Sequence, residues 1–299
     1  AIRRAGATSG RDGRVIWSDL LRQAAQTLTA AGIEGAPRDA RRLAAHVLGI
    51  DASRITLIAQ DPVAPGLAQL YTQIIDQRAR RVPVSHLTGT RQFYGRTFEV
   101  TPDVLDPRPE TEILIQAALA RPWQRLLDLG TGSGCILLTL LAERGPTAFG
   151  IGTDLSRAAL AVAMRNAAAL RLGDYVQFHA GSWLDALPAS TAAFDLIVSN
   201  PPYITLDEYA VLDPGVGLYE PRLALTDEGD GLAAYRQITS KAPAHLVQGG
   251  WLIVEIGPTQ GPAVADMFTR IGFETITVTP DFDGRDRVVA GQKPRSALL

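Results

Sequence analysis

Cysteine and lysine are nearly absent from this chain of 299 residues. The single cysteine, Cys135, excludes an internal disulfide framework and is typical of a protein in a reducing cytoplasm. The two lysines, Lys241 and Lys293, do not follow a glycine, so the Gly-Lys-Ser/Thr phosphate loop is missing. The sequence therefore excludes most P-loop chemistry and predicts a cytoplasmic location.

Long apolar runs and a basic stripe are also missing. No run approaches the roughly 18 residues of a membrane span, and the charged N-terminus leads into no signal-peptide core, so we expect neither membrane insertion nor export. The net charge is −2, with basic and acidic residues mixed along the chain, which disfavours direct binding to nucleic acid. The histidines are scattered without a second ligand at metal-binding spacing, so we expect no metal: His46, His86, His179 and His245.

The chain instead offers two different hydrophobic patterns. Residues 1–82 have the periodicity of short amphipathic helices, one capped by Ser18 and others over about 37–48 and 66–80, which predicts a small helical domain. Residues 83–106 hold aromatic and β-branched residues among glycines and prolines, which predicts a β-hairpin linker. Residues 107–299 form the remaining domain.

Apolar strand patterns alternate with helices in residues 107–299. Helices between the first five strands predict an α/β fold, a mainly parallel Rossmann-like sheet covered on both faces, and the last two strands are close enough to pair as a hairpin. The seven expected strands are Arg125–Leu129, Thr147–Thr153, Val176–Ala180, Phe194–Ser199, Trp251–Ile256, Glu274–Thr279 and Arg287–Ala290.

A glycine-rich turn follows the first of these strands. Ligands of open α/β sheets bind beyond the carboxyl ends of the strands, and glycines let the backbone approach a bulky ligand. A dinucleotide fingerprint would need a glycine at Cys135, so the spacing disfavours NAD and indicates another nucleoside. The candidate binding residues of the turn are Gly130, Thr131, Gly132, Ser133 and Gly134.

Two further side chains follow the next strands in order. Asp154 ends the second strand, where its carboxylate can accept hydrogen bonds from both ribose hydroxyls; alternatively, it caps the helix that starts near Ser156. Trp183 follows the third strand, where its ring can lie against an adenine; alternatively, it is an ordinary core residue. Together with the glycine turn, they predict a nucleoside cofactor.

The fourth strand leads into Asn200-Pro201-Pro202-Tyr203. The prolines donate no N–H, so the turn exposes carbonyl oxygens, and the Asn200 amide oxygen is a further acceptor. A planar NH₂ group can donate one hydrogen to Asn200 and one to the Pro201 carbonyl, while Tyr203 stacks on it. This arrangement predicts methylation of a planar amide-type nitrogen; the alternative is a rigid structural turn.

These motifs resemble those of class I methyltransferases, which carry a seven-stranded sheet. Four further segments resemble the bacterial release factor glutamine methyltransferase family, also called HemK or PrmC: Phe93–Gly95, Pro107–Glu112, Glu220–Leu225 and Gly284–Arg287. One departure is Asp106, where the family usually has an apolar residue, and we expect it to affect local packing.

The resemblance implies a protein-(glutamine-N5) methyltransferase that modifies the Gly-Gly-Gln glutamine of peptide chain release factors and so modulates translation termination. It also implies S-adenosylmethionine as cofactor, with S-adenosylhomocysteine as product, at the glycine turn, Asp154, Trp183 and Asn200. The helical domain would dock the protein substrate, and we expect a monomer. Two alternatives stay open: a nucleic-acid methyltransferase acting on adenine N6 or guanine N2, and a non-catalytic module that docks release factors.

Overall fold

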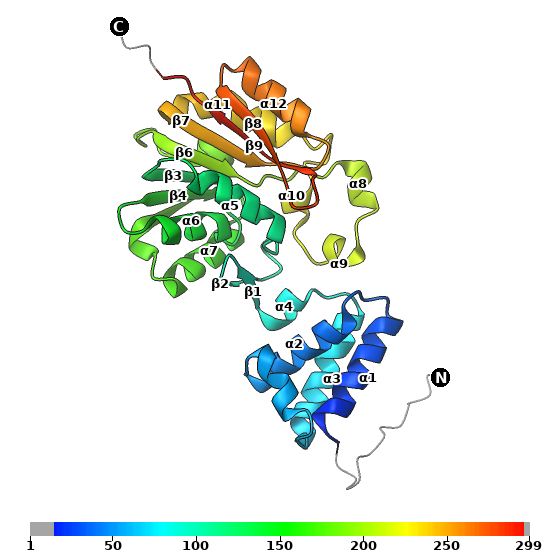
Figure 1. Cartoon of the computed structure of the whole chain (residues 1–299). Helices are drawn as coiled ribbons and strands as arrows, with labels where there is room; N and C mark the ends of the chain where they lie inside the picture. The colour runs from blue at the N-terminus through cyan, green and yellow to red at the C-terminus, as the bar shows by residue number, and fades with distance from the viewer. Residues whose placement is uncertain (1–14, 296–299) are drawn as a thin grey trace. The chain divides into compact units, whose positions relative to one another are not determined.

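The computed structural model describes residues 15–295, which form two compact units (Figure 1). The first unit comprises residues 15–89 with Pro214–Tyr219, and the second comprises Thr90–Asp213 with residues 220–295. Each unit has a hydrophobic core of its own. The segment 83–106, expected as one linker, divides between the two units after residue 89.

The first unit is helical. Its core lies around Leu28, Leu43 and Tyr71, and the Tyr71 hydroxyl donates to the Ala40 carbonyl at 2.9 Å. The elements are α1 (Trp17–Ala30), α2 (Ala36–Leu48), η1 (Ala52–Ile58), α3 (Pro65–Ala79), α4 (Val84–Thr88) and α9 (Pro214–Gly217).

The prediction that Ser18 caps the first helix is wrong. Helix α1 begins one residue earlier, at the buried Trp17, and its N-cap Ile16 forms no side-chain cap. The backbone N–H groups of Trp17 and Ser18 instead donate to the carbonyls of Asp61 and Ala59, so the helix start needs no side-chain cap.

The second unit is built on a seven-stranded sheet in the order β5-β4-β3-β6-β7-β9-β8. Strands β3 to β7 are parallel, and β9 runs antiparallel to both β7 and β8. The strands are β3 (Arg125–Leu129), β4 (Phe149–Asp154), β5 (Val176–Ala180), β6 (Phe194–Ser199), β7 (Leu246–Glu255), β8 (Glu274–Pro280) and β9 (Asp286–Gln292). This confirms the predicted α/β class and the class I methyltransferase sheet, including the final hairpin.

Helices cover both faces of this sheet (Figure 1). Alternating residues of β3 explain why: Leu126 packs in the core on one face, whereas Leu127 and Leu129 pack in the core on the other. On the Leu126 side lie α5 (Glu112–Leu119), α6 (Cys135–Arg144) and α7 (Arg157–Ala169), and on the other side lie η4 (Trp183–Ala186), α11 (Ala233–His245) and α12 (Gly261–Arg270).

A small hairpin and several short helices complete the second unit. Strands β1 (Thr90–Phe93) and β2 (Arg96–Glu99) pair antiparallel, and Phe93 and Phe98 enter the core that contains α5 and α6. The short helices are η2 (Pro109–Thr111), η3 (Gly173–Tyr175), α8 (Leu206–Ala210) and α10 (Arg222–Leu225).

Candidate active site

A cavity of about 680 Å³ lies in the second unit, at the carboxyl ends of the central strands. It follows the rule that open α/β sheets bind ligands where the strand order reverses, here between β3 and β6. The cavity is lined by these predicted site residues: Gly130, Thr131, Gly132, Ser133, Asp154, Trp183, Asn200 and Pro202. Gly134, Pro201 and Tyr203 are not among its lining residues.

Hydrogen bonds to residues of β3 and β4 fix the glycine turn that follows β3. The N–H groups of Gly130 and Thr131 both donate to the Thr153 carbonyl at 2.9 Å. The Thr131 hydroxyl donates to Asp128 Oδ2 at 2.6 Å. Asp128 is fully buried, and burial raises its pKa to about 7 although the Thr131 hydrogen bond opposes the rise. The turn is therefore tied to both β3 and β4.

Gly134 serves packing rather than contact with the cavity. It is the N-cap of α6 with φ of +79°, and a Cβ there would lie 3.0 Å from Leu138 Cδ1 and 3.3 Å from Ala163 Cβ. Because an L side chain is strained at this φ and the space is filled, only glycine fits. Gly134 lets α6 start directly after the turn.

Of the two roles that the sequence left open for Asp154, the structure excludes the helix cap, and the ribose role stays a prediction. Its Oδ1 accepts from the Ser156 N–H at 2.8 Å, and its Oδ2 accepts from the Gly132 N–H at 2.9 Å. The N-cap of α7 is Ser156, whose hydroxyl accepts from the Ala159 N–H, so Asp154 does not cap the helix. Burial raises the pKa of Asp154, and its carboxylate, which lines the cavity, has further lone pairs to offer a ligand.

Trp183 packs against the core, and its expected contact with an adenine stays a prediction. Its ring packs against the core on the α11 side and would lie 3.2 Å from a Cβ at Gly130. The residue has φ of +46° and lines the cavity. Gly130 therefore leaves room for the ring, which reaches the cavity while it contacts the core.

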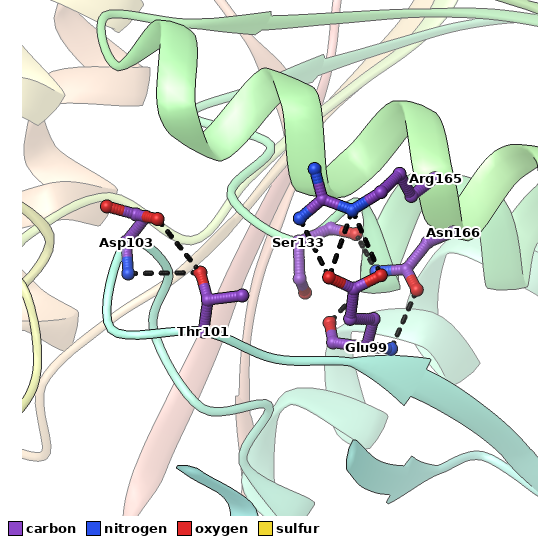
Figure 2. Close-up of polar contacts among 6 residues, drawn as sticks. All are labelled: Glu99, Thr101, Asp103, Ser133, Arg165 and Asn166. Atoms are coloured by element: carbon purple, nitrogen blue, oxygen red, sulfur yellow. Dashed lines mark hydrogen bonds and ion pairs between the residues drawn. The ribbon is translucent and has the colours of Figure 1, made fainter. Parts of the chain in front are cut away.

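Asn166 links Ser133 of the glycine turn to Glu99 of strand β2 (Figure 2). Its Nδ2 donates to the carbonyls of Ser133, at 2.9 Å, and Glu99, at 3.1 Å, while its Oδ1 accepts from the Glu99 N–H at 2.7 Å. The side chain is 2% exposed. Next to it, Arg165 forms a bidentate ion pair with the Glu99 carboxylate on the surface. Asn166 thus joins α7, β2 and the turn.

Asn200 leaves β6 beside this turn. The Ser199 hydroxyl donates to the Leu129 carbonyl at 2.7 Å, which locks the ends of β6 and β3 together. Asn200 Nδ2 donates to Thr111 Oγ1 at 3.3 Å, and no described residue donates to the Pro201 carbonyl. The structure therefore places an amide and an unclaimed backbone acceptor at the carboxyl end of β6.

Tyr203 does not line the cavity, and its hydroxyl contacts two buried polar side chains. It donates to Glu255 Oε1 at 3.5 Å, and Arg287 Nη1 donates to it at the same distance. Burial raises the pKa of Tyr203 well above its usual range. The expected stacking of its ring on a substrate stays a prediction.

Sequence reasoning gave no role to Thr111 and did not single out Glu255. Both are buried, and Thr111 lines the cavity. Burial raises the pKa of Glu255 to about 7, whereas the nearby Thr111 hydroxyl and the charge of Arg287 lower it. One signal was visible: Glu255 is the single charged residue in the apolar run Trp251–Ile256.

Asp106 and Glu220 join two of the segments that carried the resemblance. Arg108 Nη2 lies 2.6 Å from Glu220 Oε1, and the Asp106 N–H donates to Glu220 Oε2 at 3.3 Å. Asp106 itself is buried and lies 3.5 Å from Arg91 Nη1, which offsets its charge. The departure at Asp106 is therefore accommodated by an ion pair rather than by apolar packing.

The described part of the chain contains neither a cluster of metal-binding side chains nor a membrane-spanning helix. Within residues 15–295, no three His, Cys, Asp or Glu side chains gather as a metal site. No helix in the same range is long and apolar enough to cross a membrane.

Comparison with known proteins finds relatives that match most of the chain. Residues 19–89 match the family described as the PrmC N-terminal domain, and residues 122–245 match a methyltransferase domain. The release factor glutamine methyltransferase of Cereibacter sphaeroides is 54% identical over 93% of this chain and 98% of its own. That of Rhodospirillum rubrum is 40% identical over 98% of this chain and 90% of its own.

The chain belongs to the release factor glutamine methyltransferase family. This confirms the resemblance seen in the sequence. Among solved structures, the hMettl16 catalytic domain, determined in complex with a MAT2A 3'UTR hairpin, covers 75% of this methyltransferase and 84% of its own chain, with a TM-score of 0.56 and 17% identity. At that identity the likeness shows the shared fold alone.

Proposed function

We propose that this chain transfers a methyl group from S-adenosylmethionine to N5 of the glutamine in the Gly-Gly-Gln motif of peptide chain release factors. The observation that carries the proposal is Asn200, whose side-chain amide lines the cavity at the carboxyl end of β6. Membership of the family supports the choice of a protein glutamine as the acceptor.

The described residues of the cavity fit the proposed cofactor. Asp154 offers carboxylate lone pairs to two ribose hydroxyls, and Trp183 offers an aromatic surface to the adenine. The backbone of the glycine turn borders the cavity with little side-chain bulk. When bound, S-adenosylmethionine supplies an electrophilic methyl group, and the sulfur of the departing S-adenosylhomocysteine keeps the electron pair of the broken C–S bond.

Asn200 and Pro201 would hold the glutamine amide for this transfer. The Asn200 Oδ1 accepts one N–H of the substrate and the Pro201 carbonyl accepts the other, so the nitrogen is fixed for in-line attack. An amide nitrogen is a weak nucleophile because its lone pair is shared with its own carbonyl. Two acceptors stabilise the positive charge that grows on it as the N–C bond forms, and the nitrogen then releases one proton to water.

The remaining expectations belong to the same proposal. The helical unit, residues 15–89 with Pro214–Tyr219, would dock the release factor. We propose that the enzyme acts as a monomer in the cytoplasm, needs no metal and methylates a protein rather than a nucleic acid.

A competition between acceptors tests the proposal. The protein is incubated with methyl-labelled S-adenosylmethionine and, in parallel, a purified release factor, DNA oligonucleotides and ribosomal RNA. We expect label on the release factor alone. Label on nucleic acid alone would identify a nucleic-acid methyltransferase, and binding of the release factor without transfer would identify a docking module.

A further inference from the structure

The turn Asn200–Tyr203 is held at both of its ends. Just before it, the Ser199 hydroxyl donates to the Leu129 carbonyl at 2.7 Å. At its last residue, the Tyr203 carbonyl accepts from Gln260 Nε2 at 3.0 Å. The two prolines between these points have φ fixed by their rings, so the turn is stiff. A shift at its end is therefore passed on to the carbonyl oxygens of the turn.

The side-chain amide of Gln260 contacts three separate backbone segments. Its Nε2 donates to the Tyr203 carbonyl and, at 3.1 Å, to the Gly231 carbonyl. Its Oε1 accepts from the N–H of Gly257, beyond the end of β7, at 2.9 Å. Because an N–H only donates and a carbonyl only accepts, these partners fix which end of the amide faces which segment. Gln260 thus joins the turn, the end of β7 and the loop 226–232 between α10 and α11.

The place of Gln260 in the sequence does not explain these contacts. Gln260 is the N-cap residue of α12, but its side chain does not cap that helix. The residues preferred at an N-cap have short side chains that reach back to the first N–H groups of the helix. The longer glutamine side chain instead reaches Tyr203, which is 57 residues away in the sequence. Its role therefore lies at the turn rather than at the start of α12.

Gly231 shows how closely the loop 226–232 lies against the turn. It has φ of +72°, and a Cβ there would lie 2.3 Å from the Tyr203 carbonyl oxygen and 2.8 Å from Gln260 Nε2. Only glycine fits such a contact between two backbones. The loop and the turn are therefore in direct contact at the carbonyl that Gln260 binds.

The loop is itself ordered and forms part of the cavity wall. The Asp227 carboxylate accepts from three backbone N–H groups at 2.9–3.0 Å, those of Gly229, Gly231 and Ala233. Asp227 also lines the cavity. The Leu206 N–H donates to the Gly229 carbonyl at 3.1 Å, which joins the loop to the chain that follows the turn. The turn and the loop are thus one connected wall, and Gln260 links this wall to the end of β7.

We infer that Gln260 is a positioning residue that sets the location of the Pro201 carbonyl by holding the end of the turn against the sheet. This inference rests on the proposed function. Gln260 is not among the residues that line the cavity, so it acts through Tyr203 and touches no reacting atom. The substrate nitrogen needs two acceptors at hydrogen-bonding distance at once, and a displaced turn would satisfy only one of them.

The test compares variants of the full chain with a release factor as substrate. Gln260→Met keeps the length of the side chain and removes all three hydrogen bonds. We expect kcat to fall on the order of 10-fold, with KM for the release factor little changed. The Kd for S-adenosylmethionine should also stay the same, because its expected binding residues follow β3, β4 and β5.

Gln292→Met is the matched control. The Gln292 side chain also donates to a backbone carbonyl, that of Gly249 at 2.8 Å, and it does not line the cavity. This variant should lose some stability but keep the kcat of the wild-type chain. The pair therefore separates the loss of a side-chain hydrogen bond in general from the loss of the contact with the turn.

Gln260→Glu provides a second test that keeps the link to β7. One carboxylate oxygen can still accept from the Gly257 N–H, but the other cannot donate to the carbonyls of Tyr203 and Gly231. We expect kcat to fall at least as far as in Gln260→Met.

A kcat close to that of the wild-type chain in both Gln260 variants would overturn the inference. So would a loss of S-adenosylmethionine affinity as large as the loss of kcat, which would indicate general damage to the cavity. Failure of both variants to fold would assign Gln260 to the stability of the fold and would also overturn it. If the wild-type chain methylates no release factor, the proposed function fails instead.

Discussion

Replacing Asn166 by leucine removes the side chain that ties three parts of the fold together. Leucine has a similar volume but neither donates nor accepts, so three hydrogen bonds disappear at once (Figure 2). The groups left without their partner are the Glu99 N–H, the Glu99 carbonyl and the Ser133 carbonyl. The loss therefore falls on the hairpin and on the glycine turn together.

The expected cost follows from the burial of this site. An unsatisfied buried polar group costs about 1–3 kcal/mol, and Asn166 is 2% exposed. Three such groups, partly compensated where water reaches the Glu99 backbone, give a loss of roughly 3–5 kcal/mol in the free energy of unfolding. Arg165→Leu is the matched control on the neighbouring residue, because its ion pair with Glu99 is exposed to solvent, which screens the attraction between the two charges.

Urea unfolding measures both variants, and calorimetry measures their affinity for S-adenosylmethionine. We expect Asn166→Leu to weaken cofactor binding as well, because Ser133 lies in the turn that lines the cavity. In Asn166→Asp, one oxygen still accepts from the Glu99 N–H while the other faces two carbonyls. Folding should raise the pKa of that carboxyl, so this variant should gain stability as the pH falls.

A loss of stability in Asn166→Leu no larger than that in Arg165→Leu would contradict this role of Asn166. So would an Asn166→Asp variant with the pH dependence of the wild-type chain.

Three further predictions concern single residues of the same site. Asp154→Ala should weaken S-adenosylmethionine binding at least tenfold by calorimetry, whereas Asp174→Ala, at an exposed acid, should not; equal affinities would remove the ribose role from Asp154. Burial raises the pKa of Asp128 to about 7, so its proton stabilises the fold below about pH 4 and this contribution is lost as the pH rises through 7. Asp128→Asn should flatten that part of the stability curve, and an unchanged curve would contradict the assignment. Gly134→Ala should destabilise more than Gly272→Ala, because both have φ near +80° but only Gly134 has atoms within 4 Å of the added Cβ; equal losses of stability would show that the packing around Gly134 can adjust.

Much of the fold follows from local sequence patterns. Alternating apolar strands and helices between residues 107 and 299 predicted the covered parallel sheet, and the structure confirms it. Only local details differ: β7 begins at Leu246, five residues before the predicted Trp251, and α1 begins before Ser18. The error at Ser18 arose because carbonyls of residues 59 and 61 satisfy the first N–H groups of the helix, a tertiary contact that the local pattern does not contain.

The sequence predicted the residues of the candidate site that follow directly after a strand, but not those that only the fold brings together. The glycine turn and Asp154 were visible because each follows directly after its own strand. Thr111 and Asn200 are 89 residues apart in the sequence, so no local motif predicts their hydrogen bond. Asn166 joins residues from β2 and the turn after β3 for the same reason, and only the fold brings them together.

The central claim is that Asn200 holds a protein glutamine for methylation, and tandem mass spectrometry of the product tests it most directly. A purified release factor is incubated with S-adenosylmethionine and either the wild-type chain or Asn200→Ala. We predict one methyl group on the side-chain nitrogen of the Gly-Gly-Gln glutamine with the wild-type chain, formed on the order of 100-fold more slowly or more slowly still with Asn200→Ala. A methyl group on any other residue, or an Asn200→Ala variant as fast as the wild-type chain, would contradict the account.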